Sequence, residues 1–172
     1  VARIAHLLSQ ATPASRWRME VTTRADGVTV INDAYNANPK SMELALQILA
    51  EMKGKGRAIA VLGDMLEMGD FSVEAHQQIG ERVGELSIDF LVALGDEAPV
   101  LVESAIRHGL TSERARVVES HSEAISMLKE VMGRGDWILV KGSRRMRMEK
   151  IVEGLMERRD HKNVVSSPLS SS

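Results

Sequence analysis

Apolar and polar residues alternate with a period of two near the start of the chain and with longer periods after it. RMEVTTR from Arg18 and VTVIND from Val28 alternate on either side of the turn ADG, which is typical of a β-hairpin. Downstream, short runs that are apolar throughout take turns with stretches of helical periodicity. These patterns predict strands near 57–63, 88–95, 114–120 and 136–142, and helices near 41–53, 72–86, 97–108, 122–132 and 145–158.

This order of strands and helices predicts one architecture. Strands that are apolar on both faces must be covered on both faces, and an alternating βα order favours a mainly parallel sheet with right-handed crossovers. Ser41, Ser72 and Ser122 stand where three of the helices begin and are candidate N-caps. The chain is therefore predicted to form a Rossmann-like, doubly wound α/β domain with an N-terminal antiparallel β-hairpin and helices on both faces of the sheet.

The length of 172 residues suits one domain with a substantial core. The stretch VARIAHLLSQATPAS predicts that residues 1–16 are a linker or the end of a preceding central domain. The Ser-rich end predicts a disordered tail over 160–172, which leaves 17–159 as the folded domain. Aromatic residues are few and there are ten Met, so we expect aliphatic side chains and Met to fill the core.

Charge and cysteine content exclude several classes of protein. The formal net charge of -2 leaves no basic excess for binding nucleic acid. No Cys occurs, which rules out disulfides and thiolate metal sites, and the five His are too scattered to predict a metal site. The apolar runs are too short to span a membrane and no signal-peptide pattern occurs, so we expect a soluble, cytoplasmic protein.

Polar residues gather directly after the predicted strands. The carboxyl ends of parallel strands share one edge of a sheet, where helix N-termini also lie, so these side chains are expected near a ligand. Asp33 follows a strand end, where a carboxylate can bind ribose hydroxyls, and Lys141 ends the last strand above a helix start, which favours an anion. The candidates in chain order are Asp33, Tyr35, Asn36, Asn38, Ser41, Asp64, Glu67, His76, Asp96, His121, Lys141, Ser143, Arg144 and Glu149.

Each candidate also has an ordinary structural explanation. Asx side chains in loops often hydrogen-bond their own backbone, and for Asn38 this is the more frequent role. Asp64 and Glu67 fit solvated loop acids, and His76 on an amphipathic helix fits a packed or surface side chain. The basic residues after the last strand fit a solvated face, with which Glu149 can pair: Arg144, Arg145, Arg147 and Lys150.

Several well-known catalytic motifs are missing from the sequence. It contains no GxxxxGK[ST] phosphate loop, no GxGxxG and no GxSxG nucleophile elbow. The chain is therefore not a complete P-loop enzyme.

Three motifs carry a resemblance to a known family. DAYNANPKSM, VLGDMLEMGDFSVEAH and VKGSRRMRME, in this order and at these distances, resemble the C-terminal domain of the Mur ligases, from about Arg18 to about Arg158. The KGSR form near the last strand is similar to the members that add D-alanyl-D-alanine to UDP-N-acetylmuramoyl-tripeptide during peptidoglycan precursor synthesis. The resemblance implies an ATP-dependent peptide ligase whose P-loop ATPase domain is absent here. The chain is then inactive alone and closes over that central domain.

The resemblance also implies roles near the nucleotide. ATP phosphorylates the tripeptide carboxylate, and the dipeptide amine attacks the acyl phosphate, with Mg²⁺ held mainly by the central domain. By position, Asp33 matches the carboxylate that holds the ATP ribose, and Arg18 matches an arginine that approaches the nucleotide. Tyr35 and Asn36 match the neighbouring nucleotide loop. Family members usually carry Gly before this arginine, whereas Trp17 stands here and Arg16 competes with Arg18 for the role.

Other residues are expected around the dipeptide. The resemblance implies that Lys141, Arg144 and His76 act near the acyl phosphate, and that Lys141 or Arg144 pairs with the dipeptide carboxylate. The expected lining of the dipeptide pocket consists of Asn38, Asp64, Glu67 and Ser143. The expected partners are ATP, D-alanyl-D-alanine and, through other domains, UDP-N-acetylmuramoyl-tripeptide; we expect no nucleic acid, no membrane and a monomer.

Two other functions compete with this one. Asp33 and Asp64 after two strands, with Lys141 after the last, imitate the phosphoacceptor triad of a receiver-like signalling domain. The leading hairpin and the lack of a paired acid beside Asp33 disfavour that function. A plain interaction domain without a ligand would be favoured only if the loops failed to converge.

Overall fold

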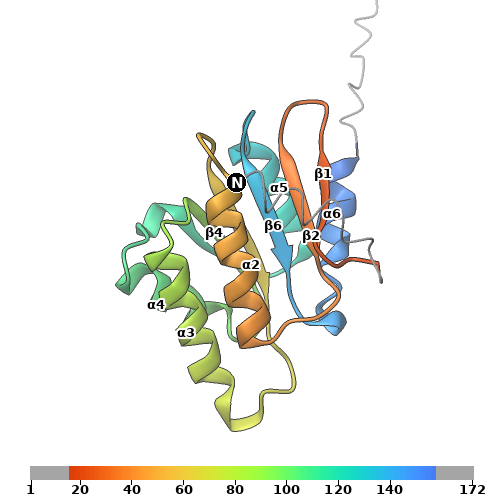
Figure 1. The fold of residues 1–172 in the computed structure, drawn as a ribbon. Coiled ribbons are helices and arrows are strands. Elements are labelled where there is room, and N and C mark those ends of the chain that lie inside the picture. The colour runs from red at the N-terminus through yellow and green to blue at the C-terminus, as the bar shows by residue number, and fades with distance from the viewer. Residues whose placement is uncertain (1–15, 158–172) are drawn as a thin grey trace, which may run out of the picture.

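The computed structural model describes residues 16–157, which form a sheet with helices on both faces (Figure 1). Residues 1–15 of the predicted linker and the predicted tail over 160–172 lie outside the described residues. The strands are β1 Glu20–Thr23, β2 Thr29–Asp33, β3 Ala58–Gly63, β4 Phe90–Leu94, β5 Ala115–Val118 and β6 Trp137–Lys141. The α-helices of the described range are α2 Pro39–Met52, α3 Ser72–Glu85, α4 Ala98–Arg107, α5 His121–Val131 and α6 Glu149–Met156.

The predicted elements are all present, and their ends shift by a few residues. The largest difference is in the last helix, predicted over 145–158, where a short 3-10 turn over Arg144–Met146 precedes α6. Arg147 separates the two because its φ of 52° lies in the left-handed region, which a right-handed helix cannot include.

The strand order in the sheet is β1-β2-β6-β3-β4-β5. β1 pairs with β2 in antiparallel fashion, which confirms the predicted hairpin, and the other neighbours are parallel. β6 lies between β2 and β3, with Lys141 in register with Asp33 on one side and Leu62 on the other. The carboxyl ends of these three strands are therefore level, toward the bottom of Figure 1, and their loops emerge side by side.

Two apolar layers cover the sheet, one on each face. Along β3, Ala58, Ala60 and Leu62 belong to the core that includes α2, α3 and α4. Ile59 and Val61 point the other way, into the core that includes α5 and α6. Because successive side chains of a strand face opposite sides, a strand buried on both faces must be apolar at every position. This explains the uninterrupted apolar runs and confirms the doubly wound α/β fold.

The helix starts correct the cap predictions. Asn38 rather than Ser41 caps α2: the Asn38 side chain accepts a hydrogen bond from the Ser41 N–H at 2.9 Å, and the Ser41 Oγ accepts one from the Asn38 N–H at 3.1 Å. Ser120 rather than Ser122 caps α5, and Ser72 is the first residue of α3. Apolar periodicity locates a helix, but the cap is the residue whose backbone is still extended at the junction.

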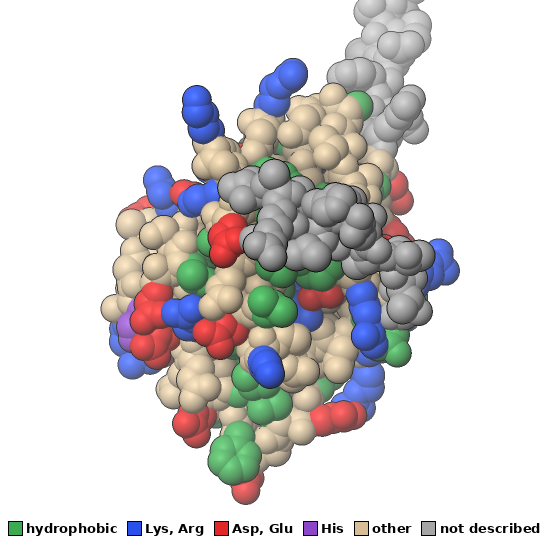
Figure 2. All heavy atoms as spheres, viewed as in Figure 1, with side chains coloured by type: hydrophobic (Ala, Val, Ile, Leu, Met, Phe, Trp, Pro, Cys, Tyr) green, Lys and Arg blue, Asp and Glu red, His purple; other side chains and the backbone are tan. Residues whose placement is uncertain are grey.

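The surface mixes charges of both signs with single apolar side chains, as Figure 2 shows for the face over α2. Leu44, Phe71 and Val73 are among the large apolar side chains that are exposed. Within residues 16–157, no helix has both the length and the apolar character needed to cross a membrane.

Candidate functional site

A buried ion pair joins the ends of β2 and β6. The Lys141 Nζ donates to the Asp33 Oδ2 at 2.6 Å and to the Asn36 carbonyl at 2.7 Å. The other carboxylate oxygen of Asp33 accepts the Met19 N–H at 3.2 Å. Lys141 is 2% exposed and Asp33 is 9% exposed. The predicted acid and base therefore meet at one edge of the sheet, and each is already held by the protein.

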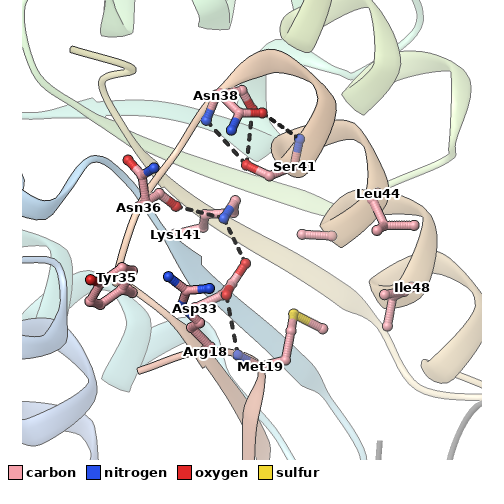
Figure 3. A pocket seen from close by; sticks show the side chains of 11 residues that line it. Arg18, Met19, Asp33, Tyr35, Asn36, Asn38, Ser41, Leu44, Ile48 and Lys141 are labelled. Atoms are coloured by element: carbon pink, nitrogen blue, oxygen red, sulfur yellow. Dashed lines mark hydrogen bonds and ion pairs between the residues drawn. The ribbon is translucent and has the colours of Figure 1, made fainter. Parts of the chain in front are cut away.

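A cavity of about 310 Å³ opens above this pair (Figure 3). Its apolar wall comes from α2, where Leu44 and Ile48 stand one turn apart, and from Met19. Its polar lining consists of Arg18, Asp33, Tyr35, Asn36, Asn38, Ser41 and Lys141. An apolar wall opposite a few convergent polar groups is typical of a small-molecule site, and this volume reaches the lower end of the usual range.

The segment before β1 closes one side of this cavity. Trp17 and Met19 both have left-handed backbones, with φ of 64° and 46°. Between them, the Arg18 guanidinium lies 4.2 Å from the centroid of the Tyr35 ring. The Tyr35 N–H donates to the Trp17 carbonyl at 3.1 Å, so the segment is tied to the loop after β2. Trp17 thus stands at a position whose conformation favours glycine, which matches the Gly expected there.

A second, smaller cavity of about 90 Å³ lies beside the first and shares Asn36 with it. Its other lining residues are Leu66, Glu67, Ser143, Arg144 and Arg145. Ser143 joins two loops here, because its Oγ accepts the Leu66 N–H at 2.8 Å and its own N–H donates to the Asp64 carbonyl at 3.0 Å. An exposed acid and two exposed arginines therefore meet around one small hollow.

The Arg144 guanidinium is held between an aromatic ring and a buried acid. It lies 4.2 Å from the centroid of the Trp17 ring, and its Nη1 donates to both carboxylate oxygens of Glu149 at 3.0 Å. The expected pairing of Glu149 with a neighbouring base is confirmed.

Asp64 supports the start of α4. Its carboxylate accepts the Asp96 N–H at 2.8 Å and the Glu97 N–H at 3.2 Å. Burial raises the pKa of the Asp64 carboxyl above its ordinary value of 3.8, and these two hydrogen bonds oppose that shift only in part. Gly95, with φ of 129°, lies so close that an added Cβ would be 2.3 Å from the Asp64 Cγ. The carboxylate is thus packed against backbone.

His76 is fully buried and both of its ring nitrogens have partners. Its Nε2 accepts the Met65 N–H at 3.0 Å, and its Nδ1 lies 2.7 Å from the Ser72 carbonyl. A neutral imidazole protonated on Nδ1 satisfies both contacts. This hydrogen bonding gives His76 a structural part in the loop after β3, and it leaves no ring nitrogen for a substrate.

The predicted residues therefore divide into groups. Arg18, Asp33, Tyr35, Asn36, Asn38, Ser41 and Lys141 line the larger cavity, and Glu67, Ser143 and Arg144 line the smaller one. Asp64 and His76 line neither, and each has partners inside the protein. Within residues 16–157, no group of three or more His, Asp or Glu side chains is arranged to hold a metal ion.

Sequence reasoning missed the apolar part of the site. Leu44 and Ile48 lie in the predicted helix, and their i, i+4 spacing places them on one face of α2, but periodicity alone does not show that this part of the face borders a cavity. No sequence pattern marks Met19 as a cavity residue. It lines the cavity only because β1, which follows it, pairs with β2 and brings it beside the loop after β2. The partners of Trp17 also depend on contacts between distant segments.

Comparison with known proteins identifies the relatives of this chain. The family model described as Mur ligase, glutamate ligase domain, matches residues 17–144. UDP-N-acetylmuramoyl-tripeptide–D-alanyl-D-alanine ligase from Bacillus subtilis is 36% identical over 140 residues, which cover 81% of this chain. The chain spans only about 30% of the length of that relative.

Solved structures of the same family superpose on this chain. MurF from Acinetobacter baumannii superposes with a TM-score of 0.72 and 32% sequence identity, over 84% of this chain and 31% of that one. MurF ligase from Thermotoga maritima, solved in complex with ADP, superposes with a TM-score of 0.70 and 25% identity, over 83% of this chain and 31% of that one. The fold expected from the motifs is therefore shared with solved relatives.

Proposed function

The chain belongs to the Mur ligase family, and we propose that it acts as the C-terminal domain of a cytoplasmic, ATP-dependent ligase that joins D-alanyl-D-alanine to UDP-N-acetylmuramoyl-tripeptide. The observation that carries this proposal is the match over most of the chain to ligases of that name. The product is a peptidoglycan precursor. The rest of the reaction, including phosphate transfer, belongs to the longer polypeptide.

The larger cavity is the proposed binding site for the nucleoside part of ATP. The flat adenine packs against the apolar wall of Leu44, Ile48 and Met19, where burial of apolar surface favours it. The Asp33 carboxylate retains lone pairs beyond its bonds to Lys141 and Met19 and accepts hydrogen bonds from the ribose hydroxyls. The Arg18 side chain covers the opening above Tyr35.

Arg144 is the proposed partner of the dipeptide carboxylate, in preference to Lys141. The Lys141 ammonium is buried and donates to Asp33 and Asn36, so its function is to hold the Asp33 carboxylate in place. Arg144 lines the smaller cavity and is partly exposed, with 43% of its side chain accessible. Glu67 on the same cavity supplies a negative charge for the amine end of the dipeptide.

Magnesium is proposed to accompany ATP, with its protein ligands mainly in the central domain. Residues 16–157 contain no group of three or more His, Asp or Glu side chains arranged to hold the ion by themselves. When bound, it neutralises phosphate charge. His76 is not retained as a catalytic residue, because both of its nitrogens are engaged.

The receiver-like alternative is set aside. A phosphoacceptor triad needs two acids and a lysine around one phosphoryl group. Here the Asp64 carboxylate accepts hydrogen bonds from the loop after β4, while the Lys141 ammonium is bound to Asp33. Asp64 and Lys141 thus hold different parts of the protein, Asp64 lines neither cavity, and the family match accounts for the motifs directly.

The test of the nucleotide site is Asp33→Ala in the complete ligase. Hydrogen bonds to a charged group contribute about 1.5–3 kcal/mol, so the KM for ATP should rise about 10- to 150-fold, while the KM for the dipeptide changes much less. Thermal melting of the variant separates lost binding from lost folding. Unchanged ATP kinetics would remove Asp33 from the site.

A second measurement concerns the chain alone. We expect its affinity for ATP to be weak by calorimetry, because phosphate-binding groups belong to the central domain. Micromolar binding of ATP by these 172 residues would contradict the assignment of the phosphate-binding groups to the central domain.

A further inference from the structure

Two groups hold the Arg144 guanidinium: the ring of Trp17, which is distant in sequence, and the carboxylate of Glu149, which is nearby in sequence. The Trp17 ring covers one face of the guanidinium at 4.2 Å, and the buried carboxylate of Glu149 binds its Nη1 with two hydrogen bonds of 3.0 Å. Each contact restrains a different motion: the ring limits tilting, and the carboxylate limits rotation in the guanidinium plane. Together they restrain the guanidinium in its observed orientation.

This arrangement keeps half of the guanidinium free. Among the described residues 16–157, no hydrogen-bond acceptor is paired with the Nε or Nη2 of Arg144. These two groups form the edge of the guanidinium that binds a carboxylate through two parallel hydrogen bonds. Since Arg144 lines the smaller cavity, a fixed fork is available to an anionic end of a ligand there.

Trp17 is itself held firmly, although its backbone is strained. Its φ of 64° is uncommon for a bulky residue, and such strain persists only where the surroundings impose it. The Trp17 N–H donates to the Glu20 Oε1 at 3.0 Å, and the Trp17 carbonyl accepts the Tyr35 N–H at 3.1 Å. The indole also packs against the core that includes α6. The backbone of Trp17 is therefore held by two hydrogen bonds, and its ring is supported by packing against that core.

We propose that Trp17 is a positioning residue for the incoming dipeptide, and that its ring holds the Arg144 guanidinium in the orientation that binds the dipeptide carboxylate. The inference rests on the proposed function. It connects the segment that enters the domain with the loop after β6, so a residue outside the three sequence motifs contributes to substrate binding. The effect of its ring is expected on the dipeptide rather than on ATP, because the Trp17 side chain does not line the nucleotide cavity and its backbone bond to Tyr35 does not depend on the side chain.

The experiment compares Trp17→Phe with Trp17→Leu in the complete ligase. Both side chains are apolar, but only Phe keeps an aromatic face for the guanidinium. We expect Trp17→Phe to retain most of the affinity for D-alanyl-D-alanine and Trp17→Leu to raise the dipeptide KM about 2- to 10-fold, as a lost cation–π contact implies. The KM for ATP should be nearly the same in the two variants. Equal dipeptide KM values for the Phe and Leu variants would overturn the inference.

A cycle with Arg144→Ala distinguishes positioning from general support of the fold. If Trp17 acts through Arg144, Trp17→Leu has no further effect on the dipeptide KM once Arg144 is Ala. If Trp17 only stabilises the domain, the Leu variant weakens binding equally in both backgrounds, and the inference fails. An unchanged dipeptide KM in Arg144→Ala alone would refute both the inference and the proposed role of Arg144. A raised KM in Arg144→Ala without coupling to Trp17 would refute the inference alone.

Discussion

Lys141→Met tests the buried ion pair beneath the larger cavity. The substitution keeps an unbranched apolar stem of similar length and removes the ammonium that lies 2.6 Å from the Asp33 Oδ2. The Asp33 carboxylate, with 13% of its side chain exposed, then lacks a counter-charge, and the Asn36 carbonyl loses its donor. Removing one partner of a buried pair costs about 3–5 kcal/mol, and the remaining Met19 N–H bond favours the lower end, near 3 kcal/mol.

The assay is urea and thermal denaturation of the 172-residue chain at neutral pH. A loss of about 3 kcal/mol lowers the melting temperature of a domain of this size by roughly 6–12 °C. Lys40→Met is the matched control, because Lys40 is exposed on the first turn of α2. A substitution at such a site should change the free energy of unfolding by no more than about 0.5 kcal/mol.

A double variant with Asp33→Asn completes the test. Once both charges are gone, no unpaired charge is buried, so the double variant should recover about 2 kcal/mol relative to Lys141→Met alone. Two results would refute this reasoning: Lys141→Met as stable as Lys40→Met, or a double variant no more stable than Lys141→Met. Either would mean that the ammonium and the carboxylate are not a buried pair in solution.

Substitutions at a glycine and at an aspartate test other parts of the structure. Gly95→Ala should lower the free energy of unfolding by more than about 2 kcal/mol, because its Cβ would lie 2.3 Å from the Asp64 Cγ at a φ of 129°. The control Gly54→Ala, at a φ of 55° and with open space around it, should lower it by about 1 kcal/mol. Equal melting temperatures for the two would count against the packing of Asp64. Burial alone would raise the pKa of Asp89, but the hydrogen bond from Lys53 and other favourable contacts lower it below 3.8. Its carboxylate therefore stabilises the fold above pH 3.8, and the stability advantage over Asp89→Asn should shrink as the pH falls below that value; an advantage that grows on acidification would contradict the assignment.

Much of the fold could be predicted from the sequence, because local patterns reflect burial. Runs such as AIAVLG over 58–63 are apolar at every position, and only a strand covered on both faces requires that. The hairpin followed from the ADG turn. The exact helix starts did not follow, since Asn38 and Ser41 are both good capping residues and only the backbone conformation decides between them.

The candidate site could be predicted in part. Polar residues after parallel strands converge on one edge whatever the details, so Asp33 and Lys141 were expected to face a common cleft. The direct pairing of Asp33 with Lys141 depends on β6 lying beside β2, and no local sequence pattern predicts the order of strands in a sheet. The inward hydrogen bonds of His76 depend in the same way on how the loop after β3 folds back over α3.

The sequence by itself therefore determined the kinds of element, the covered sheet and the three motifs that identify the family, because burial and turn chemistry act over neighbouring residues. Tertiary structure alone decided which charges pair and which remain available. Lys141 is bound to Asp33, Glu149 holds one end of Arg144, and Trp17 lies on its face, although most of these partners are over a hundred residues apart. The energy of a charge depends on what surrounds it in space, and those surroundings form only when distant segments pack together.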